Sequence, residues 1–86
     1  MDLSFKPRFL RKFNRLPRPL REEAREKIEL FRDTKNHQLL KVHKLQGRMS
    51  DCCSFSVNYR YRIIFKWEKQ NESAVLLTIG DHSVYN

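Results

Sequence analysis

Glycine, proline and cysteine are all scarce in this sequence, at 2, 3 and 2 residues out of 86. So little glycine and proline argues against a low-complexity or disordered chain. The longest apolar runs, such as residues 74–77, are far too short to cross a bilayer. The first residues also lack the basic and apolar segments of a secretory signal. Collagen-like chains, membrane-spanning proteins and multidomain enzymes are therefore excluded, and we expect residues 1–86 to form one domain.

The two cysteines, Cys52 and Cys53, are adjacent in the sequence. Neighbouring residues cannot easily reach disulfide geometry, so a reduced, cytoplasmic protein is the simpler interpretation. We expect both cysteines to be small residues of the core. A zinc site needs about four ligands at recognisable spacing, which these cysteines and the histidines do not show. The carboxylates are scattered, which disfavours a magnesium nuclease. We expect neither a metal nor another cofactor.

The positive charge lies in the first part of the chain. The net charge is +8, and residues 1–50 hold 14 basic and 6 acidic residues, whereas residues 51–86 hold 4 of each. Six basic residues and no acidic residue lie between Lys6 and Arg18. A solvated helix face is one interpretation of this cluster. Unbalanced charge destabilises a fold, however, so a nucleic acid or an acidic protein partner covering the face is the alternative.

The first half of the chain predicts one strand and two helices. Residues 1–6 alternate between apolar and polar side chains, which is typical of a strand. Residues 7–16 carry apolar side chains at helical spacing after a proline suited to a first turn. Residues 19–34 repeat that pattern, with Glu23 and Lys27 spaced for an ion pair on one helix face. The prolines between the two segments predict a helical hairpin.

The second half predicts a meander of three strands. Apolar residues at helical spacing over 39–45 lead to a turn at Gln46–Gly47, after which the period changes to two. The strands are expected at 53–57, 62–67 and 74–79, with a hairpin loop at 68–73 and a continuously apolar last strand typical of a central position covered on both faces. The order β-α-α-β-β-β predicts an α+β fold, with a small antiparallel sheet and the helical hairpin packed on one face.

Three side chains stand out for their chemistry. Arg62 lies inside an apolar strand, so it must point to the face that the helices leave open. His43 stands at the entry to the meander, and His82 follows the last strand. Each histidine alone fits a surface or capping role. Together, two imidazoles and a guanidinium suit metal-free RNA cleavage, which needs a base, an acid and a cation for the phosphoryl oxygens.

The sequence resembles a known family at this point. The element order, the segments His43–Gly47 and Tyr61–Phe65, and the end Leu77–Tyr85 are similar to the RelE/ParE toxin superfamily of bacterial toxin–antitoxin modules, above all to the YafQ-like and RelE-type messenger-RNA endonucleases. The resemblance implies a RelE-like fold and a cytoplasmic toxin. Such a toxin cleaves mRNA in the ribosomal A site, inhibits translation and is silenced by a cognate antitoxin.

The resemblance also implies a set of site residues. The catalytic positions are His43, Arg62, His82 and the terminal aromatic residue Tyr85. Ser54 and Ser56 stand where RelE has two catalytic lysines, and the spacing from His82 to Tyr85 is one residue shorter than usual. We expect RNA to be bound by nearby basic side chains and by bases stacking on tyrosines. These residues are Lys12, Arg15, Lys41, Lys44, Arg48 and Arg60, with Tyr59, Tyr61 and Tyr85 as the tyrosines.

Two alternatives share the fold. One is a gyrase-inhibiting toxin of the ParE branch, which does no RNA chemistry. The other is a catalytically weakened protein that binds RNA or antitoxin, and it is motivated by Ser54 and Ser56, since serine hydroxyls supply no positive charge.

Overall fold

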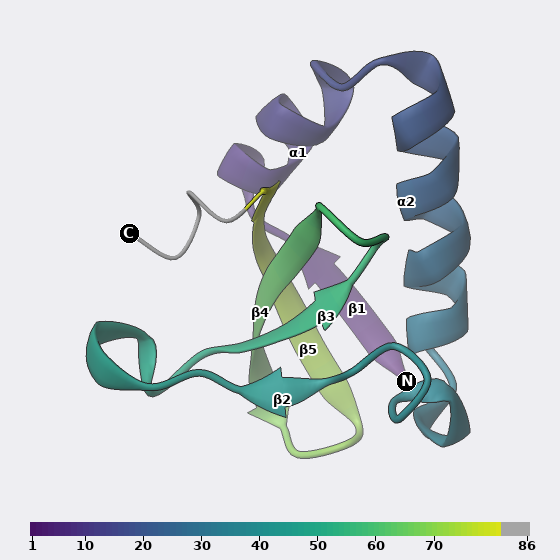
Figure 1. Cartoon of the computed structure of the whole chain (residues 1–86). Helices are drawn as coiled ribbons and strands as arrows, with labels where there is room; N and C mark the ends of the chain where they lie inside the picture. The colour runs from purple at the N-terminus through teal and green to yellow at the C-terminus, as the bar shows by residue number, and fades with distance from the viewer. Residues whose placement is uncertain (82–86) are drawn as a thin grey trace.

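The computed structural model describes residues 1–81 and shows two helices packed against a five-stranded sheet (Figure 1). Two single-turn 3₁₀ segments, η1 and η2, lie in the connections. The elements are β1 (Asp2–Phe5), α1 (Pro7–Asn14), α2 (Arg18–Phe31), η1 (Thr34–Asn36), β2 (His43–Lys44), η2 (Gly47–Met49), β3 (Cys53–Ser56), β4 (Arg62–Lys69) and β5 (Ser73–Gly80).

The sheet confirms the α+β class and adds details that the sequence did not predict. Its strand order is β1-β5-β4-β3-β2; β1 runs parallel to β5 and the other pairs are antiparallel. The expectation of four strands was wrong, because His43 and Lys44 pair with β3 in place of continuing the helical period of 39–45. The last strand, β5, has a neighbouring strand at each edge, but β4 holds the middle position of the sheet.

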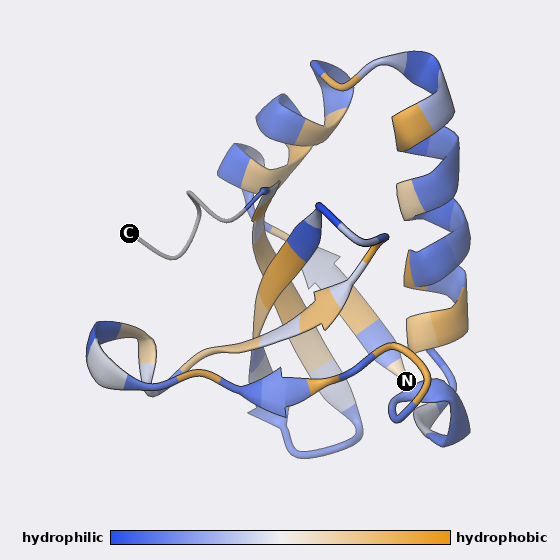
Figure 2. Cartoon of the chain, in the orientation of Figure 1, coloured by the Kyte–Doolittle hydropathy of each residue, from blue (hydrophilic) through white to orange (hydrophobic). Residues whose placement is uncertain are grey.

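Both helices present an apolar stripe to the sheet and a polar face to solvent, as Figure 2 shows. Helix α1 begins at Pro7, where a missing N–H costs nothing, and ends at Asn14, two residues before the predicted end. Helix α2 begins at Arg18 after Pro17 and ends at Phe31. The side chain of Arg21 donates a hydrogen bond of 2.9 Å to the Leu16 carbonyl in the turn between them. Neither helix is long and apolar enough to cross a membrane.

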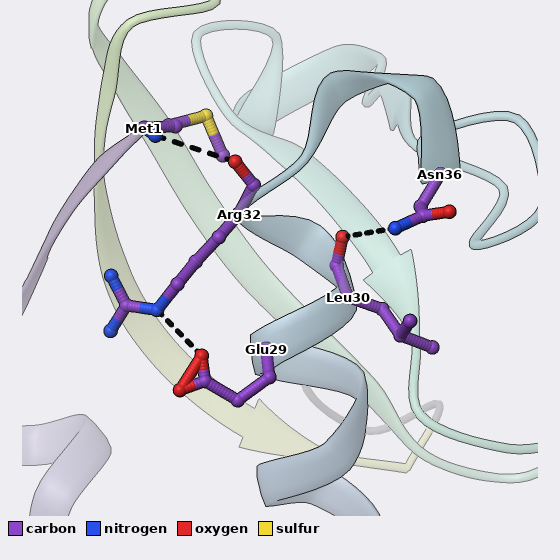
Figure 3. Close-up of polar contacts among 5 residues, drawn as sticks. All are labelled: Met1, Glu29, Leu30, Arg32 and Asn36. Atoms are coloured by element: carbon purple, nitrogen blue, oxygen red, sulfur yellow. Dashed lines mark hydrogen bonds and ion pairs between the residues drawn. The ribbon is translucent and has the colours of Figure 1, made fainter.

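The carboxyl end of α2 is tied down by contacts from outside the helix (Figure 3). The last carbonyls of a helix lack intrahelical partners. Here Asn36 Nδ2 donates to the Leu30 carbonyl at 2.9 Å, and the Met1 nitrogen donates to the Arg32 carbonyl at 3.3 Å. Arg32 also forms an ion pair of 2.8 Å with Glu29. These contacts join α2 to the start of β1 and to the following turn.

Phe31, the last residue of α2, lies at the centre of the aromatic core. Its ring stacks on Phe55 of β3 at 4.2 Å and meets Phe65 of β4 edge-on at 4.7 Å. His37 stacks on Phe31 at 4.8 Å, and its Nε2 donates to the Phe31 carbonyl at 2.8 Å. His37 therefore has a structural role that satisfies a helix-end carbonyl.

A bulge in β5 adjusts which of its side chains reach the core. Residues 65 and 64 of β4 pair with Leu76 and Thr78, so Leu77 is an extra residue without a partner in the β4–β5 register. Because of this bulge, Leu76 and Ile79 both enter the core although three positions separate them.

Candidate functional site

The sheet face opposite the helices carries two rows of cross-strand neighbours. Ile63 and Phe65 of β4 belong to the helix-side core, so Arg62 and Ile64 point to the other face. Residues directly opposite each other on neighbouring strands share a face. One row is His43, Ser54, Ile64 and Thr78, and the second is Ser56, Arg62 and Gly80.

The Arg62 guanidinium is held by the loop that precedes β4. Nη1 donates to the carbonyls of Asn58 at 2.7 Å, Tyr61 at 3.1 Å and Tyr59 at 3.3 Å. A guanidinium has five N–H donors, and these three acceptors engage a single nitrogen. No ion pair within residues 1–81 neutralises Arg62. The loop thus orients a positive charge at the start of β4, where Arg62 borders both a hollow on the side of His43 and a groove on the side of α2.

Asn58 organises this loop and fastens it to α2. Its Oδ1 accepts hydrogen bonds from the backbone nitrogens of Arg60 and Tyr61, both at 2.8 Å, and its Nδ2 donates to Glu23 at 2.7 Å. Glu23 was expected to pair with Lys27, but within residues 1–81 no ion pair joins the two. Asn58 was not among the predicted site residues, although asparagine is a turn-forming residue whose side chain hydrogen-bonds the backbone two residues on.

His43 is exposed on β2 with its ring fixed by one hydrogen bond. Its Nδ1 lies 2.8 Å from the carbonyl oxygen of Lys41. A carbonyl can only accept, so Nδ1 carries the proton, and in the neutral ring Nε2 keeps its lone pair. Lys41 has a φ of 59°, which turns its carbonyl toward the ring. The contact fixes the ring of His43 and leaves its Nε2 able to accept a hydrogen bond.

His43 and Arg62 line the same hollow. The hollow has a volume of about 420 Å³, and Leu45, Gln46 and Met49 complete its lining. The strand register separates the Cα atoms of His43 and Arg62 by two strand spacings and one two-residue step, or roughly 12 Å. Their side chains thus stand on two sides of one hollow, with room for a ligand between them.

The loop that carries η2 forms one wall of this hollow and is pinned to the sheet. It projects to the far left in Figure 1. Asp51 forms an ion pair of 2.9 Å with Lys66 of β4, and the hydrogen bond from Lys66 lowers the pKa of Asp51. Gly47, with a φ of 69°, provides the predicted turn at the start of the loop. The thiol of Cys52 donates to Asp51 at 3.5 Å, and burial raises the pKa of Cys52.

Four small residues lie in and just before β3, namely Cys52, Cys53, Ser54 and Ser56. Ser54 is 0% exposed and Ser56 is half-buried next to Arg62. Cys52 is buried, and Cys53 is half-buried against the core, so both thiols have the packing role expected of them. Burial also raises the pKa of Cys53, which keeps the thiol protonated near neutral pH.

The predicted RNA-binding residues lie on several elements. Lys41 and Arg60 are exposed in the turns next to His43 and Arg62, and Arg48 is exposed on η2. Lys44 is exposed on β2 but faces the opposite side of the sheet from His43. Helix α1 lies at the end of the sheet where β5 ends and β4 begins (Figure 1). Two further candidates, Lys12 and Arg15, belong to the carboxyl end of α1.

Two of the predicted catalytic residues lie outside the described part of the chain. His82 and Tyr85 both belong to residues 82–86. Both stay predictions, and of the four catalytic candidates His43 and Arg62 are the pair that the structure brings to one hollow.

Comparison with known proteins identifies the fold. No family model matches this chain, and no curated protein matches it in sequence. Solved structures do match: RelE in the intact E. coli RelBE toxin–antitoxin complex has a TM-score of 0.70 at 21% identity, covering 93% of this chain and 94% of that one. A YafQ mutant from E. coli has a TM-score of 0.71 at 14% identity, covering 98% and 96%. The YoeB–YefM complex from Staphylococcus aureus has a TM-score of 0.71 at 13% identity, covering 95% and 97%.

The two helices on a five-stranded sheet thus form a small α+β fold that toxin–antitoxin proteins also have. More particularly, this chain has the fold of the RelE/ParE toxins, with YafQ and RelE types among its structural neighbours. The fold expected from the resemblance is confirmed.

Proposed function

We propose that this protein is the toxin of a toxin–antitoxin pair and a ribosome-dependent, metal-free endoribonuclease that cleaves mRNA and inhibits translation. The observation that carries the proposal is the hollow shared by His43 and Arg62 on the open face of the sheet. An oriented imidazole and a guanidinium that no ion pair within residues 1–81 neutralises, both in one hollow, are two of the three groups that this chemistry requires.

The reaction uses the 2′-hydroxyl of the RNA as the nucleophile. His43 Nε2 removes the 2′-hydroxyl proton while the 2′-oxygen forms a bond to the adjacent phosphorus. Arg62 donates hydrogen bonds to the phosphoryl oxygens, where negative charge develops. The bond from phosphorus to the 5′-oxygen breaks, and an acid, assigned to His82, protonates the leaving oxygen. The products are a 2′,3′-cyclic phosphate and a 5′-hydroxyl, with Tyr85 assisting near the leaving group.

The partners follow from the same proposal. The toxin acts in the cytoplasm on mRNA held by the ribosome, and basic residues on α1 and around the hollow bind the RNA backbone. A cognate antitoxin silences it, and an acidic segment that folds on binding suits the charge of +8. In support, two of the similar solved structures are toxin–antitoxin complexes.

Translation in a cell-free extract, with mapping of mRNA cut sites, tests the proposal. We expect cuts in phase with codons from the wild-type protein. Arg62→Ala should lower the cleavage rate by roughly 100-fold or more, and His43→Ala by a similar factor. Arg32→Ala is the matched control, because Arg32 is an exposed arginine paired with Glu29 at the end of α2. Full activity in both site variants would contradict the assignment.

Two additional measurements separate the two alternatives. Intact messages with double-strand DNA breaks in expressing cells indicate a gyrase-inhibiting toxin of the ParE kind. Binding of RNA or antitoxin without cleavage indicates a catalytically weakened protein. Ser54 and Ser56 favour this second alternative, because a buried and a half-buried hydroxyl beside Arg62 add no cation to the site.

A further inference from the structure

Tyr59 is the most exposed large apolar side chain among residues 1–81. Its exposed fraction is 96%, compared with 73% for Leu39 and 45% for Leu10. Tyr61, two positions later, is half-buried and packs against the core. The loop before β4 therefore divides its two tyrosines between a structural position and a position in solvent.

The loop that presents Tyr59 is held in place by the contacts described above. The Asn58 side chain accepts two backbone hydrogen bonds within the loop and donates to Glu23 of α2. Arg62 Nη1 binds the Tyr59 carbonyl itself at 3.3 Å. An aromatic ring on a mobile loop can fold back onto the protein surface at little cost in free energy, and it is then not available to a ligand. A ring held outward by a braced loop is preorganised for a ligand that covers it.

We propose that Tyr59 is a stacking platform for an unpaired RNA base whose neighbouring phosphate binds Arg62. The proposal rests on RNA as the substrate class of the proposed function and assigns a base-contacting residue beyond the reacting groups. Aromatic side chains bind single-stranded RNA in this way because every base has a π-face.

The surroundings of the ring suit a nucleotide. Tyr59 and Arg62 line a groove of about 650 Å³ between the loop and α2. Arg62 also lines the hollow of His43, so the groove and the hollow meet at one cation. Arg60, next to Tyr59, is exposed and adds a second cation for a polyanion.

The acidic side chains of the groove fall on its other wall. Glu23 and Glu26 belong to α2, and Glu23 is already engaged by Asn58. Lys27 lies on the same wall but leaves it with two carboxylates against one cation, so a phosphate is attracted more strongly to the loop, where Arg60 and Arg62 lie. This division of charge favours a strand that runs along the loop, with a base over Tyr59, and it is the reason to choose RNA over a protein partner here.

Binding of uncleavable RNA tests the proposal without depending on catalysis. The probe is a fluorescein-labelled single-stranded RNA with 2′-O-methyl sugars, measured by anisotropy. Tyr59→Ala should weaken binding by roughly 5- to 100-fold, the usual loss when one stacked base loses its ring. Tyr59→Phe and Tyr59→Trp should retain the affinity. Leu10→Ala, which removes another exposed apolar side chain, is the matched control and should bind as the wild type does.

Three further readouts separate stacking from charge and from misfolding. Among probes with one abasic position each, one probe should bind the wild type weakly. On that probe, Tyr59→Ala should cause no further loss of affinity. Tyr59→Ala should keep the salt dependence of binding, whereas Arg60→Gln should reduce its slope by roughly 0.7. Circular dichroism confirms that each variant is folded.

The outcomes distinguish this proposal from the proposed function. Unchanged RNA affinity in Tyr59→Ala, or an equal loss on every abasic probe, overturns the stacking role even if the protein cleaves mRNA. Binding that depends on Tyr59 and on one base supports the stacking role even if the extract shows no cleavage. An absence of cleavage in the extract overturns the proposed nuclease activity instead.

Discussion

At the scale of single residues, the contacts of the backbone decide what the site's side chains can do. One carbonyl, that of Lys41, sets which nitrogen of His43 holds the proton. Three carbonyls hold the Arg62 guanidinium at the start of β4. The positions of these backbone oxygens cannot be read from the sequence. The site residues His43 and Arg62 could therefore be predicted, but the orientation of their side chains could not.

Thr78 gives a test of packing on the same sheet face. In the described part of the chain its Oγ1 is a buried side-chain atom without a hydrogen-bond partner. Such a group carries a desolvation cost, so Thr78→Val should raise the free energy of unfolding by about 1 kcal/mol. Urea unfolding followed by the fluorescence of Trp67 measures the change.

Thr78→Ser is the control, because it keeps the hydroxyl and removes the methyl group. It should lower the free energy of unfolding by about 1 kcal/mol. A valine variant no more stable than the wild type would mean that the hydroxyl has a partner in solution.

At the scale of elements, the turn before β2 explains why the predicted helical period of 39–45 gives way to a strand. Lys41 donates to the Gln38 carbonyl and Val42 to the His37 carbonyl, which is the hydrogen-bond pattern that closes a helical turn with one left-handed residue. That residue is Lys41, with a φ of 59°. The left-handed step redirects the chain, and His43 follows it into the sheet.

Lys41→Gly should stabilise this turn. A left-handed φ costs a side chain with a Cβ about 1 kcal/mol relative to glycine. Lys41→Ala is the matched control, because it removes the same charge and keeps the Cβ. We therefore expect the glycine variant to exceed the alanine variant by about 1 kcal/mol in the free energy of unfolding, measured by urea unfolding. Equal stabilities would show that the turn relaxes away from this conformation.

At the scale of the whole molecule, charge sets both the attraction for polyanions and the response to pH. The net charge is +8, and within residues 1–81 the ion pairs are few and exposed. The pair of Asp51 with Lys66 joins the loop of η2 to β4. The pKa of Asp51 is lowered from 3.8 by this contact, and that of Lys66 is raised from 10.5.

Asp51→Asn should remove one contribution to acid stability. A carboxylate with a lowered pKa in the folded state stabilises the fold above pH 3.8 and loses that contribution as the pH falls through its folded pKa. Because the pKa of Lys66 is raised in the folded state, the ion pair also stabilises the fold below pH 10.5. This stabilisation is lost as the pH rises through the folded pKa of Lys66. We expect a small loss of stability at neutral pH, because the pair is exposed.

Unfolding by urea across a pH series measures this difference. Wild type and Asp51→Asn should converge as the pH falls below the folded pKa of Asp51, which is lowered from 3.8, because the carboxylate is then protonated in both states. Glu72→Gln is the control for another exposed pair, that with Lys69. A difference between wild type and Asp51→Asn that persists unchanged in acid would contradict the electrostatic explanation.

The sequence by itself determined the two amphipathic helices, the first strand, the three strands of the meander and the placement of Arg62 on the face of β4 opposite the core, because periodicity and local turn residues encode which side chains must be buried. The tertiary structure decided the addition of β2, the parallel pairing of β1 with β5, and the bulge at Leu77. It also decided that His43 and Arg62 share a hollow. Strand order and register depend on hydrogen bonds between residues far apart in the chain, and no local pattern of side chains records those pairings.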